Sequence, residues 1–177
     1  MKPAQVGQAA PTFALEGVSP DGTFETYSLN DYLGRWVVLF FYPLDFTFIC
    51  PTEVMEFNRR CPEFEERNAA VFGISVDSVH CHKAWIDKQV GKLDYPLLSD
   101  ITKETSRAFG ILMKEQGIAL RGTFIIDPSG IVRYQAVLDI SVGRSVSETL
   151  RVLSALSTEE LCPVDWRPGQ ATLGKVH

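Results

Sequence analysis

Two continuous apolar stretches with a helical segment between them constrain the fold of this chain most strongly. Residues 36–42 and 70–76 are apolar without alternation, a pattern typical of strands buried on both faces. The segment between them carries an apolar stripe at spacings of three and four: Val54, Phe57, Cys61 and Phe64. This stripe predicts a helix from Pro51 to about Asn68, and Pro62 should kink it because proline removes a backbone hydrogen bond. Strand, helix and strand form a βαβ unit, which indicates the α/β class.

The rest of the chain continues this alternation and then changes it. Further helices are expected over residues 78–89 and 102–109, and further strands over 95–98, 122–126 and 131–137. Asp127-Pro-Ser-Gly130 joins the last two strands and suits an antiparallel hairpin. Ser145 and Glu148 form a capping box before a final helix that ends near Ser157.

This order of elements predicts a thioredoxin-like α/β fold, in which helices sandwich a central mixed β-sheet. Turn residues at 19–22 lie in an N-terminal extension before the first buried strand, and residues 158–177 form an irregular C-terminal tail rich in Pro and Gly. A chain of 177 residues with 45% hydrophobic residues is the size of one compact domain.

Charge and hydropathy exclude several classes of partner. The net charge is −5 and basic residues form no run, which argues against a nucleic-acid surface. The first residues lack the apolar core of a signal peptide, and no apolar stretch approaches the 18 residues of a membrane span. We therefore expect a cytoplasmic protein whose partners are small substrates or other proteins. In that compartment disulfides are usually transient and catalytic.

Cys50 is the first candidate for chemistry. It lies where the buried strand at 36–42 passes into the next helix. Pro51 follows it, and proline is preferred at the first position of a helix. At a helix N-cap, the unpaired N–H groups and the helix dipole favour a thiolate. A free cysteine is more often a small buried hydrophobe. Here Thr47 places a hydroxyl one turn before the sulfur and Pro43 can fix the loop, which favours the functional interpretation.

The other three cysteines differ in their settings, and no Cys-x-x-Cys pair is present, which argues against a zinc ribbon or a dithiol motif. Cys61 lies on the apolar helical stripe and should fill the core. Cys81 stands between His80 and His82, but adjacent helical residues point in different directions, so a metal site there is disfavoured. Cys162 lies in the irregular tail. Either it has no function, or it supplies a second sulfur on a mobile arm that can reach the sulfur of Cys50.

Charged residues near element ends could complete a site. A thiolate that attacks an O–O bond needs donors for the charge that develops on oxygen. Arg121 and Arg144 stand beside glycines near the ends of predicted elements, although either arginine alone is more often a surface charge. Glu53 lies in the first turn of the Cys50 helix, where a carboxylate suits the dipole.

With these residues in place, the chain resembles the peroxiredoxin family, and within it the typical two-cysteine, alkyl hydroperoxide reductase C-type group. The resemblance rests first on Pro43-x-x-x-Thr47-x-x-Cys50-Pro-Thr-Glu53, with Phe46 and Phe48 in the expected aromatic positions. Further similar segments cover nearly the whole chain: Val6-Gly-x-x-Ala-Pro11, Lys83-Ala-Trp85, Ser99-Asp100, Arg121-Gly-Thr-Phe-Ile-Ile-Asp127, Gly143-Arg144-Ser145 and Cys162-Pro-x-x-Trp166.

The resemblance implies a role for each candidate residue. Cys50 would be the peroxidatic nucleophile that becomes a sulfenic acid, and Thr47 would bond both the sulfur and the peroxide. Arg121 would favour the thiolate and stabilise the transition state, with Glu53 and Arg144 orienting it. Pro43 would shield the site from water. Cys162, in the tail at 158–177 that follows the domain at 1–157, would be the resolving cysteine of a neighbouring subunit.

The resemblance also implies a redox cycle and an assembly. Hydrogen peroxide and organic hydroperoxides would be reduced, and an intersubunit Cys50–Cys162 disulfide would be recycled by thioredoxin or a dedicated flavoprotein reductase. No metal or organic cofactor would be required. Homodimers would assemble further into a decamer.

Two departures from the family bear on over-oxidation. Easily over-oxidised members carry a Gly-Gly-Leu-Gly loop and a C-terminal helix with Tyr-Phe, whereas this chain has Gly91-Lys-Leu-Asp94 and ends at Gly174-Lys-Val-His177. We therefore expect a tail that unfolds readily and a sulfenic acid that is resolved before it becomes sulfinic.

Two functions other than a peroxidase have different requirements. A protein disulfide oxidoreductase on the same fold needs Cys-x-x-Cys at the helix start, and Glu53 stands where the second cysteine would be. A ring-forming chaperone or scaffold is a non-enzymatic alternative. Fast peroxide consumption that disappears in Cys50→Ser would distinguish a catalyst from such a scaffold.

Overall fold

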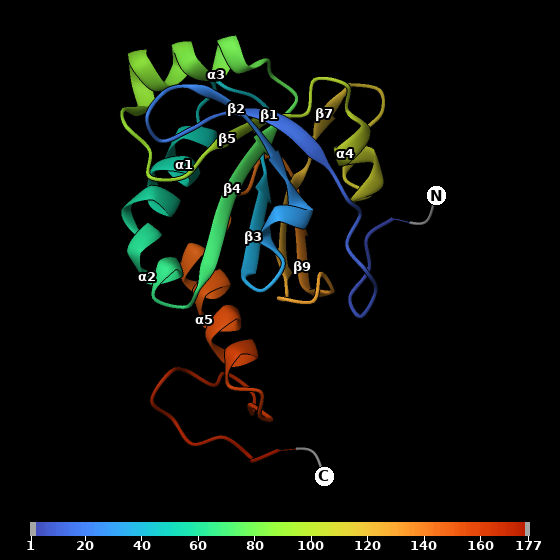
Figure 1. Cartoon of the computed structure of the whole chain (residues 1–177), viewed down its shortest axis with the longest axis vertical. Coiled ribbons are helices and arrows are strands. Elements are labelled where there is room, and N and C mark those ends of the chain that lie inside the picture. Colours follow the sequence, from blue (N-terminus) through green and yellow to red (C-terminus); the bar gives the residue numbers. More distant parts are fainter. Residues whose placement is uncertain (1–2, 176–177) are drawn as a thin grey trace.

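The structure is a computed structural model that describes residues 3–175, so the last two residues of the predicted tail lie outside the described part. A seven-stranded sheet forms its centre in the order β2-β1-β5-β4-β3-β8-β9 (Figure 1). Its middle is parallel: β3 (Trp36–Phe41) pairs with β4 (Ala69–Ser75), which pairs with β5 (Leu97–Ser99). The mixed sheet of a thioredoxin-like fold is therefore confirmed.

Antiparallel strands complete both sides of this parallel centre. β8 (Arg121–Ile126) pairs with β3 and with β9 (Val132–Leu138), which confirms the predicted hairpin. On the other side, the N-terminal extension forms a hairpin of β1 (Ala14–Val18) and β2 (Phe24–Ser28), and β1 pairs with β5. A separate small hairpin contains β6 (Leu112–Met113) and β7 (Ile118–Ala119). The sequence analysis predicted neither of these last two hairpins.

The predicted single helix after β3 is two helices. α1 (Cys50–Arg59) has Arg60 as its C-cap, and α2 (Cys61–Glu65) begins directly afterwards. Pro62 stands in the first turn of α2, where its missing N–H costs nothing, so it marks a new helix start rather than a kink. The expectation of one kinked helix was wrong. Cys50 is the first residue of α1, and Ile49 rather than Cys50 is the N-cap.

The remaining helices agree with the predicted positions. α3 (Val79–Trp85) continues into a π-helical turn, η2 (Ile86–Val90), and α4 (Glu104–Ala108) follows β5. A 3-10 turn, η1 (Leu29–Tyr32), follows β2. α5 (Val146–Ser157) begins at the predicted cap, where the Ser145 side chain accepts a hydrogen bond from the Glu148 N–H.

The sheet has a hydrophobic core on each face because side chains of β3 alternate between them. Val38, Phe40 and Tyr42 pack with α1, α2, α3 and α5 on one face. Val37, Leu39 and Phe41 pack with the N-terminal segment, η1 and Phe109 on the other. A strand that is covered on both faces in this way appears in sequence as a continuous apolar run.

The tail after α5 contains no helix or strand within the described residues and extends beyond the end of α5, at the end of the molecule away from α3 (Figure 1). Trp166 is its one buried residue between positions 158 and 175. Among residues 3–175, no helix combines the length and apolar character that a membrane span requires.

Candidate active site

Cys50 is positioned by the junction of β3 and α1. β3 ends at Phe41, a loop of residues 42–49 follows, and Cys50 begins α1 with Pro51 directly after it. We call residues 42–49 the peroxide-side loop. Only 1% of Cys50 is exposed, so its sulfur lies at a helix N-terminus away from bulk water. The positive end of the helix dipole favours a negative charge on this sulfur, and the low dielectric of the interior strengthens the interaction of that charge with nearby positive groups.

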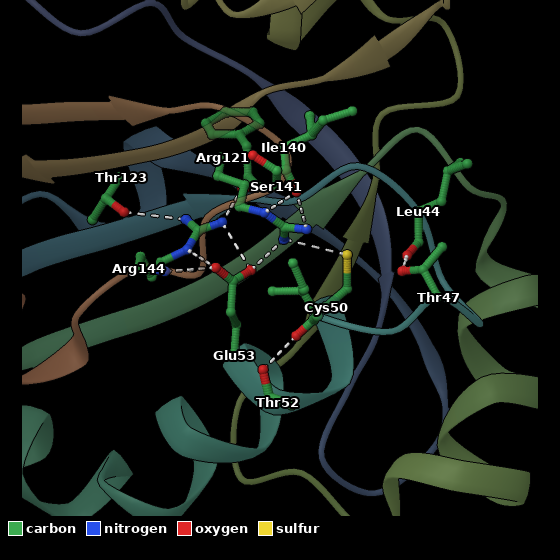
Figure 2. Close-up of polar contacts among 12 residues, drawn as sticks. Leu44, Thr47, Cys50, Thr52, Glu53, Arg121, Thr123, Ile140, Ser141 and Arg144 are labelled. Carbon is green, nitrogen blue, oxygen red and sulfur yellow. Dashed lines mark hydrogen bonds and ion pairs between the residues drawn. The ribbon is translucent and has the colours of Figure 1, made fainter.

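A buried guanidinium contacts this sulfur. Arg121, the first residue of β8, places Nη1 3.4 Å from Cys50 Sγ and 2.7 Å from Glu53 Oε2 (Figure 2). Its Nε and Nη2 donate to the Ile140 carbonyl at 3.0 and 2.8 Å. These four contacts fix the plane of the guanidinium, so Nη1 stays directed at the sulfur and the carboxylate.

Arg144 holds the other side of the same carboxylate. Its backbone N–H and its Nε donate to Glu53 Oε1 at 3.0 and 3.1 Å. Its Nη1 donates to the Gly122 carbonyl and to Thr123 Oγ1, which ties the loop before α5 to β8. Burial lowers the pKa of the Arg144 guanidinium, and the charge of Glu53 opposes that shift.

The buried charges balance only when Cys50 is a thiolate. Two guanidinium groups share the single carboxylate of Glu53, so Arg121, Arg144 and Glu53 together carry a net positive charge. Each of these three side chains is at most 4% exposed. An uncompensated buried charge is costly. A negative charge on Cys50 Sγ, next to Arg121, removes the imbalance.

Pro43 and Thr47 lie in the peroxide-side loop before this sulfur. Pro43 is buried, and the Thr47 hydroxyl donates to the Leu44 carbonyl at 2.8 Å (Figure 2). In the part of the chain that the structure describes, that hydroxyl makes no hydrogen bond to Cys50. Its oxygen keeps lone pairs that can accept a hydrogen bond from a substrate. Phe48, at the outer end of the loop, is 95% exposed.

Cys61 and Cys81 lie in unreactive settings. Cys61 is in the core, as predicted, and burial followed by the charges of Glu65 and Asp94 raises the pKa of its thiol to about 11. Burial, Asp45 and Asp77 raise the pKa of the Cys81 thiol to about 12. A raised pKa leaves little of the nucleophilic thiolate at neutral pH.

The two histidines beside Cys81 do not converge on a metal. His80 packs edge-on against Phe24, and His82 points into the core toward Asp45. The ligand atoms of Asp45, Asp77 and Cys81 do lie within 4.8 Å of one another. The carboxylate oxygens of this group already accept hydrogen bonds from protein groups, which leaves them poorly suited to a cation.

Cys162 lies apart from Cys50. Its sulfur contacts the Ala155 carbonyl at 3.8 Å and Thr158 Oγ1 at 3.6 Å, both at the C-terminal end of α5. The surrounding groove, about 1000 Å³ in volume, includes Trp36, Arg133, Arg151, Leu156 and Val164. All four cysteines are free thiols within the described residues.

The structure adds contacts that the sequence analysis missed. The Ile140, Gly122 and Phe41 carbonyls accept hydrogen bonds from the two arginines, and backbone acceptors carry no residue-type signal. Asp45 and His82, whose side chains lie 2.7 Å apart, were also missed because they are far apart in sequence. The position of Asp45 inside the Pro43-to-Thr47 motif was the one available signal.

Comparisons with known proteins agree with this geometry. The model of the AhpC/TSA family matches residues 6–135. The chain is 48% identical over 178 residues to the chloroplastic 2-Cys peroxiredoxin BAS1 of Hordeum vulgare, covering 95% of this chain and 84% of that protein. It is 46% identical over 179 residues to peroxiredoxin-1 of Gallus gallus, covering 96% and 90%.

A solved structure gives the same result at the level of the fold. The reduced 2-Cys peroxiredoxin of Plasmodium vivax superposes with a TM-score of 0.93 at 37% identity, covering 96% of this chain and 93% of that one. Similarity at this level extends over sheet, helices and tail together. The chain therefore belongs to the AhpC/TSA family and, within it, to the two-cysteine peroxiredoxins, which are thiol peroxidases.

Proposed function

We propose that Cys50 is the nucleophile with which this thiol peroxidase reduces hydrogen peroxide and organic hydroperoxides in antioxidant defence. The observation that carries the proposal is the buried Cys50 sulfur at the start of α1, with Arg121 Nη1 3.4 Å away. A cysteine at a helix N-terminus beside a guanidinium is the kind that reacts as a thiolate.

The first step oxidises the sulfur by two electrons. The thiolate attacks one peroxide oxygen, an S–O bond forms and the O–O bond breaks. The leaving oxygen departs with the bonding electron pair and takes up a proton to give water or an alcohol. Cys50 is left as a sulfenic acid. Arg121 Nη1 is placed to stabilise the charge that develops on the oxygens.

The neighbouring residues support this step in different ways. The Thr47 hydroxyl donates to the Leu44 carbonyl, so the Thr47 oxygen is free to accept a hydrogen bond from the hydroperoxide O–H and orient the substrate. Pro43 covers the sulfur without adding an N–H that would hold water. Glu53 and Arg144 are positioning residues because they hold the guanidinium of Arg121.

We infer that Cys162 of a second copy completes the cycle. Its thiol condenses with the sulfenic acid, so that an S–S bond forms and water leaves. Among the described residues, the sulfurs of Cys50 and Cys162 share no hydrogen-bond partner, which supports an intersubunit reaction. The tail at 158–177 would be the segment that carries the resolving sulfur, after the peroxidase domain at 1–157.

The disulfide must then be reduced from outside. A dithiol reductant such as thioredoxin, or the dithiol of a dedicated flavoprotein reductase, attacks the disulfide and returns both thiols by exchange. Such a cycle suits a reducing compartment such as the cytoplasm. We propose a homodimer as the working unit and a decamer as its assembly. The outer edge of β9 beyond Val132, where the N-terminal segment pairs with the strand, has no strand partner among the described residues and is available to a second copy.

A non-reducing gel after one equivalent of peroxide tests the cycle. Wild-type protein should form a covalently linked dimer, whereas Cys50→Ser and Cys162→Ser should not. Peroxide consumption should disappear in Cys50→Ser, because no other thiol in the site can form the sulfenic acid. If Cys162→Ser still gave the linked dimer, Cys61 or Cys81 would be the resolving residue and the assignment of Cys162 would be wrong.

A further inference from the structure

The peroxide-side loop has to serve two incompatible positions of the Cys50 sulfur. Peroxide reacts with a sulfur that is 1% exposed, beside Arg121. A disulfide requires two sulfurs about 2.05 Å apart, so the same atom must leave its pocket to meet another chain. The loop and the first turn of α1 must therefore open between the two steps. The contacts that hold the loop closed therefore set the relative rates of the peroxide reaction and of disulfide formation.

The closed loop is under local strain. Phe46, in its middle, has a φ of 56°, in the left-handed region that a bulky side chain rarely adopts. Such a conformation persists only where surrounding contacts impose it. The neighbouring Asp45 supplies these contacts: its backbone N–H donates to Asp77 Oδ2 at 2.9 Å, and its carboxylate is buried. The anchor and the strained residue are thus adjacent in sequence.

A buried cluster of three side chains holds Asp45. His82 Nδ1 lies 2.7 Å from Asp45 Oδ2, and the Tyr42 hydroxyl donates to Asp45 Oδ1 at 2.8 Å. His82 comes from α3, and its Nε2 lies 3.0 Å from the Leu98 carbonyl of β5. The side chains of Asp45 and His82 have no exposed surface. The cluster therefore joins the loop to α3 and β5.

The hydrogen-bond partners fix the proton arrangement in this cluster. The Leu98 carbonyl can only accept, so His82 Nε2 carries a proton. One further proton lies between His82 Nδ1 and Asp45 Oδ2, since two lone pairs cannot face each other at 2.7 Å. Burial raises the pKa of Tyr42 well above its usual range, so its hydroxyl stays a donor. The other titratable groups facing the cluster are Asp77 and Cys81.

We propose that the Tyr42–Asp45–His82 cluster is a latch that holds the peroxide-side loop closed and so sets the ratio of peroxide reaction to disulfide formation. The inference rests on the function proposed above, since both steps belong to that cycle. Its three members would be positioning residues: they act on Cys50 through the loop and do not touch the substrate. Weakening the latch should slow sulfenic acid formation, which needs the closed loop, and speed condensation, which needs the open one.

Two substitutions at Asp45 test the latch at one position. Asp45→Ala removes both side-chain hydrogen bonds. Asp45→Asn keeps them, because the amide N–H can donate to His82 Nδ1 while the amide oxygen accepts from Tyr42. We expect Asp45→Ala to slow sulfenic acid formation and accelerate disulfide formation, each at least fivefold, and Asp45→Asn to restore both rates. The two steps are followed separately by rapid mixing of reduced protein with peroxide.

Tyr42→Phe is the milder variant, which deletes a single hydrogen bond and should shift the same ratio by a factor of about five. Tyr95→Phe is its matched control: Tyr95 is also buried, and its hydroxyl donates to the Val54 carbonyl of α1 rather than to the loop. Tyr95→Phe should lose similar stability without moving the ratio. If Asp45→Ala does not fold, the comparison of Tyr42→Phe with Tyr95→Phe still tests the latch.

Three results would overturn the latch. One is equal slowing of both steps in Asp45→Ala and Tyr42→Phe, which would indicate general destabilisation. Another is an unchanged ratio in both. The third is an Asp45→Asn variant as altered as Asp45→Ala, which would show that charge and not hydrogen bonding matters. Failure of the peroxidase proposal is recognised separately, by peroxide consumption in Cys50→Ser.

Discussion

One carboxylate determines the geometry of the reactive sulfur. Glu53 accepts from both Arg121 and Arg144, and it lies one turn after Cys50 on the same helix. Each arginine alone would be a costly buried cation, and the shared carboxylate leaves room for one more negative charge. A negative charge on Cys50 would balance the group, so the electrostatics of the closed site depend on Arg121, Arg144 and Glu53 together.

Replacing Arg121 by Gln should slow the reaction with peroxide by about 10²-fold, because one preorganised donor to the developing charge is lost. The rate is measured by rapid mixing with one equivalent of hydrogen peroxide. Arg133→Gln is the control: this arginine lies on β9, pairs with Asp127 and is about half exposed. It should keep the wild-type rate. Equal rates in both variants would contradict the role given to Arg121.

The residues of the site were largely predictable from the sequence, but their burial was not. Cys50, Thr47 and Glu53 stand within one short motif, whereas Arg121 and Arg144 lie far along the chain and taken alone resembled surface charges. Both are buried because Glu53 compensates them, a pairing that exists only after folding. The latch residue His82 was unpredictable for the same reason, since its partner Asp45 is 37 positions away.

At the scale of elements, the features that the sequence predicted correctly are those that depend on hydrogen bonds within a few residues. The Ser145 cap and the Asp127–Gly130 turn were both located, because each is satisfied by neighbouring backbone groups. The break between α1 and α2 was misread as a kink, since a stripe that continues through Cys61 conceals it. The hairpin of β1 and β2 was missed because its strands are short, partly exposed and mixed in polarity.

The start of α5 matters to the site, because Arg144 directly precedes its cap. Ser145→Ala removes the side-chain acceptor for the Glu148 N–H and should cost about 1 kcal/mol of unfolding free energy. In a chain of this size that lowers Tm by about 2–4 °C in a thermal melt.

Ser147→Ala is the matched control for this cap. Ser147 lies in the first turn of the same helix, and its hydroxyl accepts only an exposed hydrogen bond from Arg60. It should therefore change Tm by less than Ser145→Ala. A Ser145→Ala variant as stable as wild type would show that the cap does not hold the start of α5.

At the scale of the whole molecule, the tail is lightly attached. Trp166 is its one buried side chain within the described residues, held by a hydrogen bond from Arg151 to its carbonyl. Cys162 Sγ also contacts the end of α5, and elsewhere the tail closes on itself, where Leu161 exchanges two backbone hydrogen bonds with Leu173 and Gly174. Detaching it exposes one large side chain, at a cost of about 2–3 kcal/mol. Cys162 can therefore be released without disturbing the sheet.

The loop at Gly91–Asp94 does not hold the first turn of α1, where Cys50 lies. Its hydrogen bonds go to Asn58, about two turns along α1 from Cys50, through Lys92 and Asp94. The first turn of α1 can thus open while these contacts stay intact. A lightly held Cys162 therefore favours fast condensation once the latch on the Cys50 side has opened.

This balance predicts resistance to over-oxidation. Condensation within an assembled dimer does not depend on peroxide, whereas conversion of sulfenic to sulfinic acid consumes a second peroxide and slows as its concentration falls. During turnover at low peroxide, mass spectrometry should therefore find Cys50 as thiol or disulfide with little sulfinic acid. Cys162→Ser, which lacks the competing reaction, should accumulate sulfinic acid under the same conditions. Equal sulfinic acid in the two proteins would mean that Cys50 is over-oxidised before the loop and tail can open.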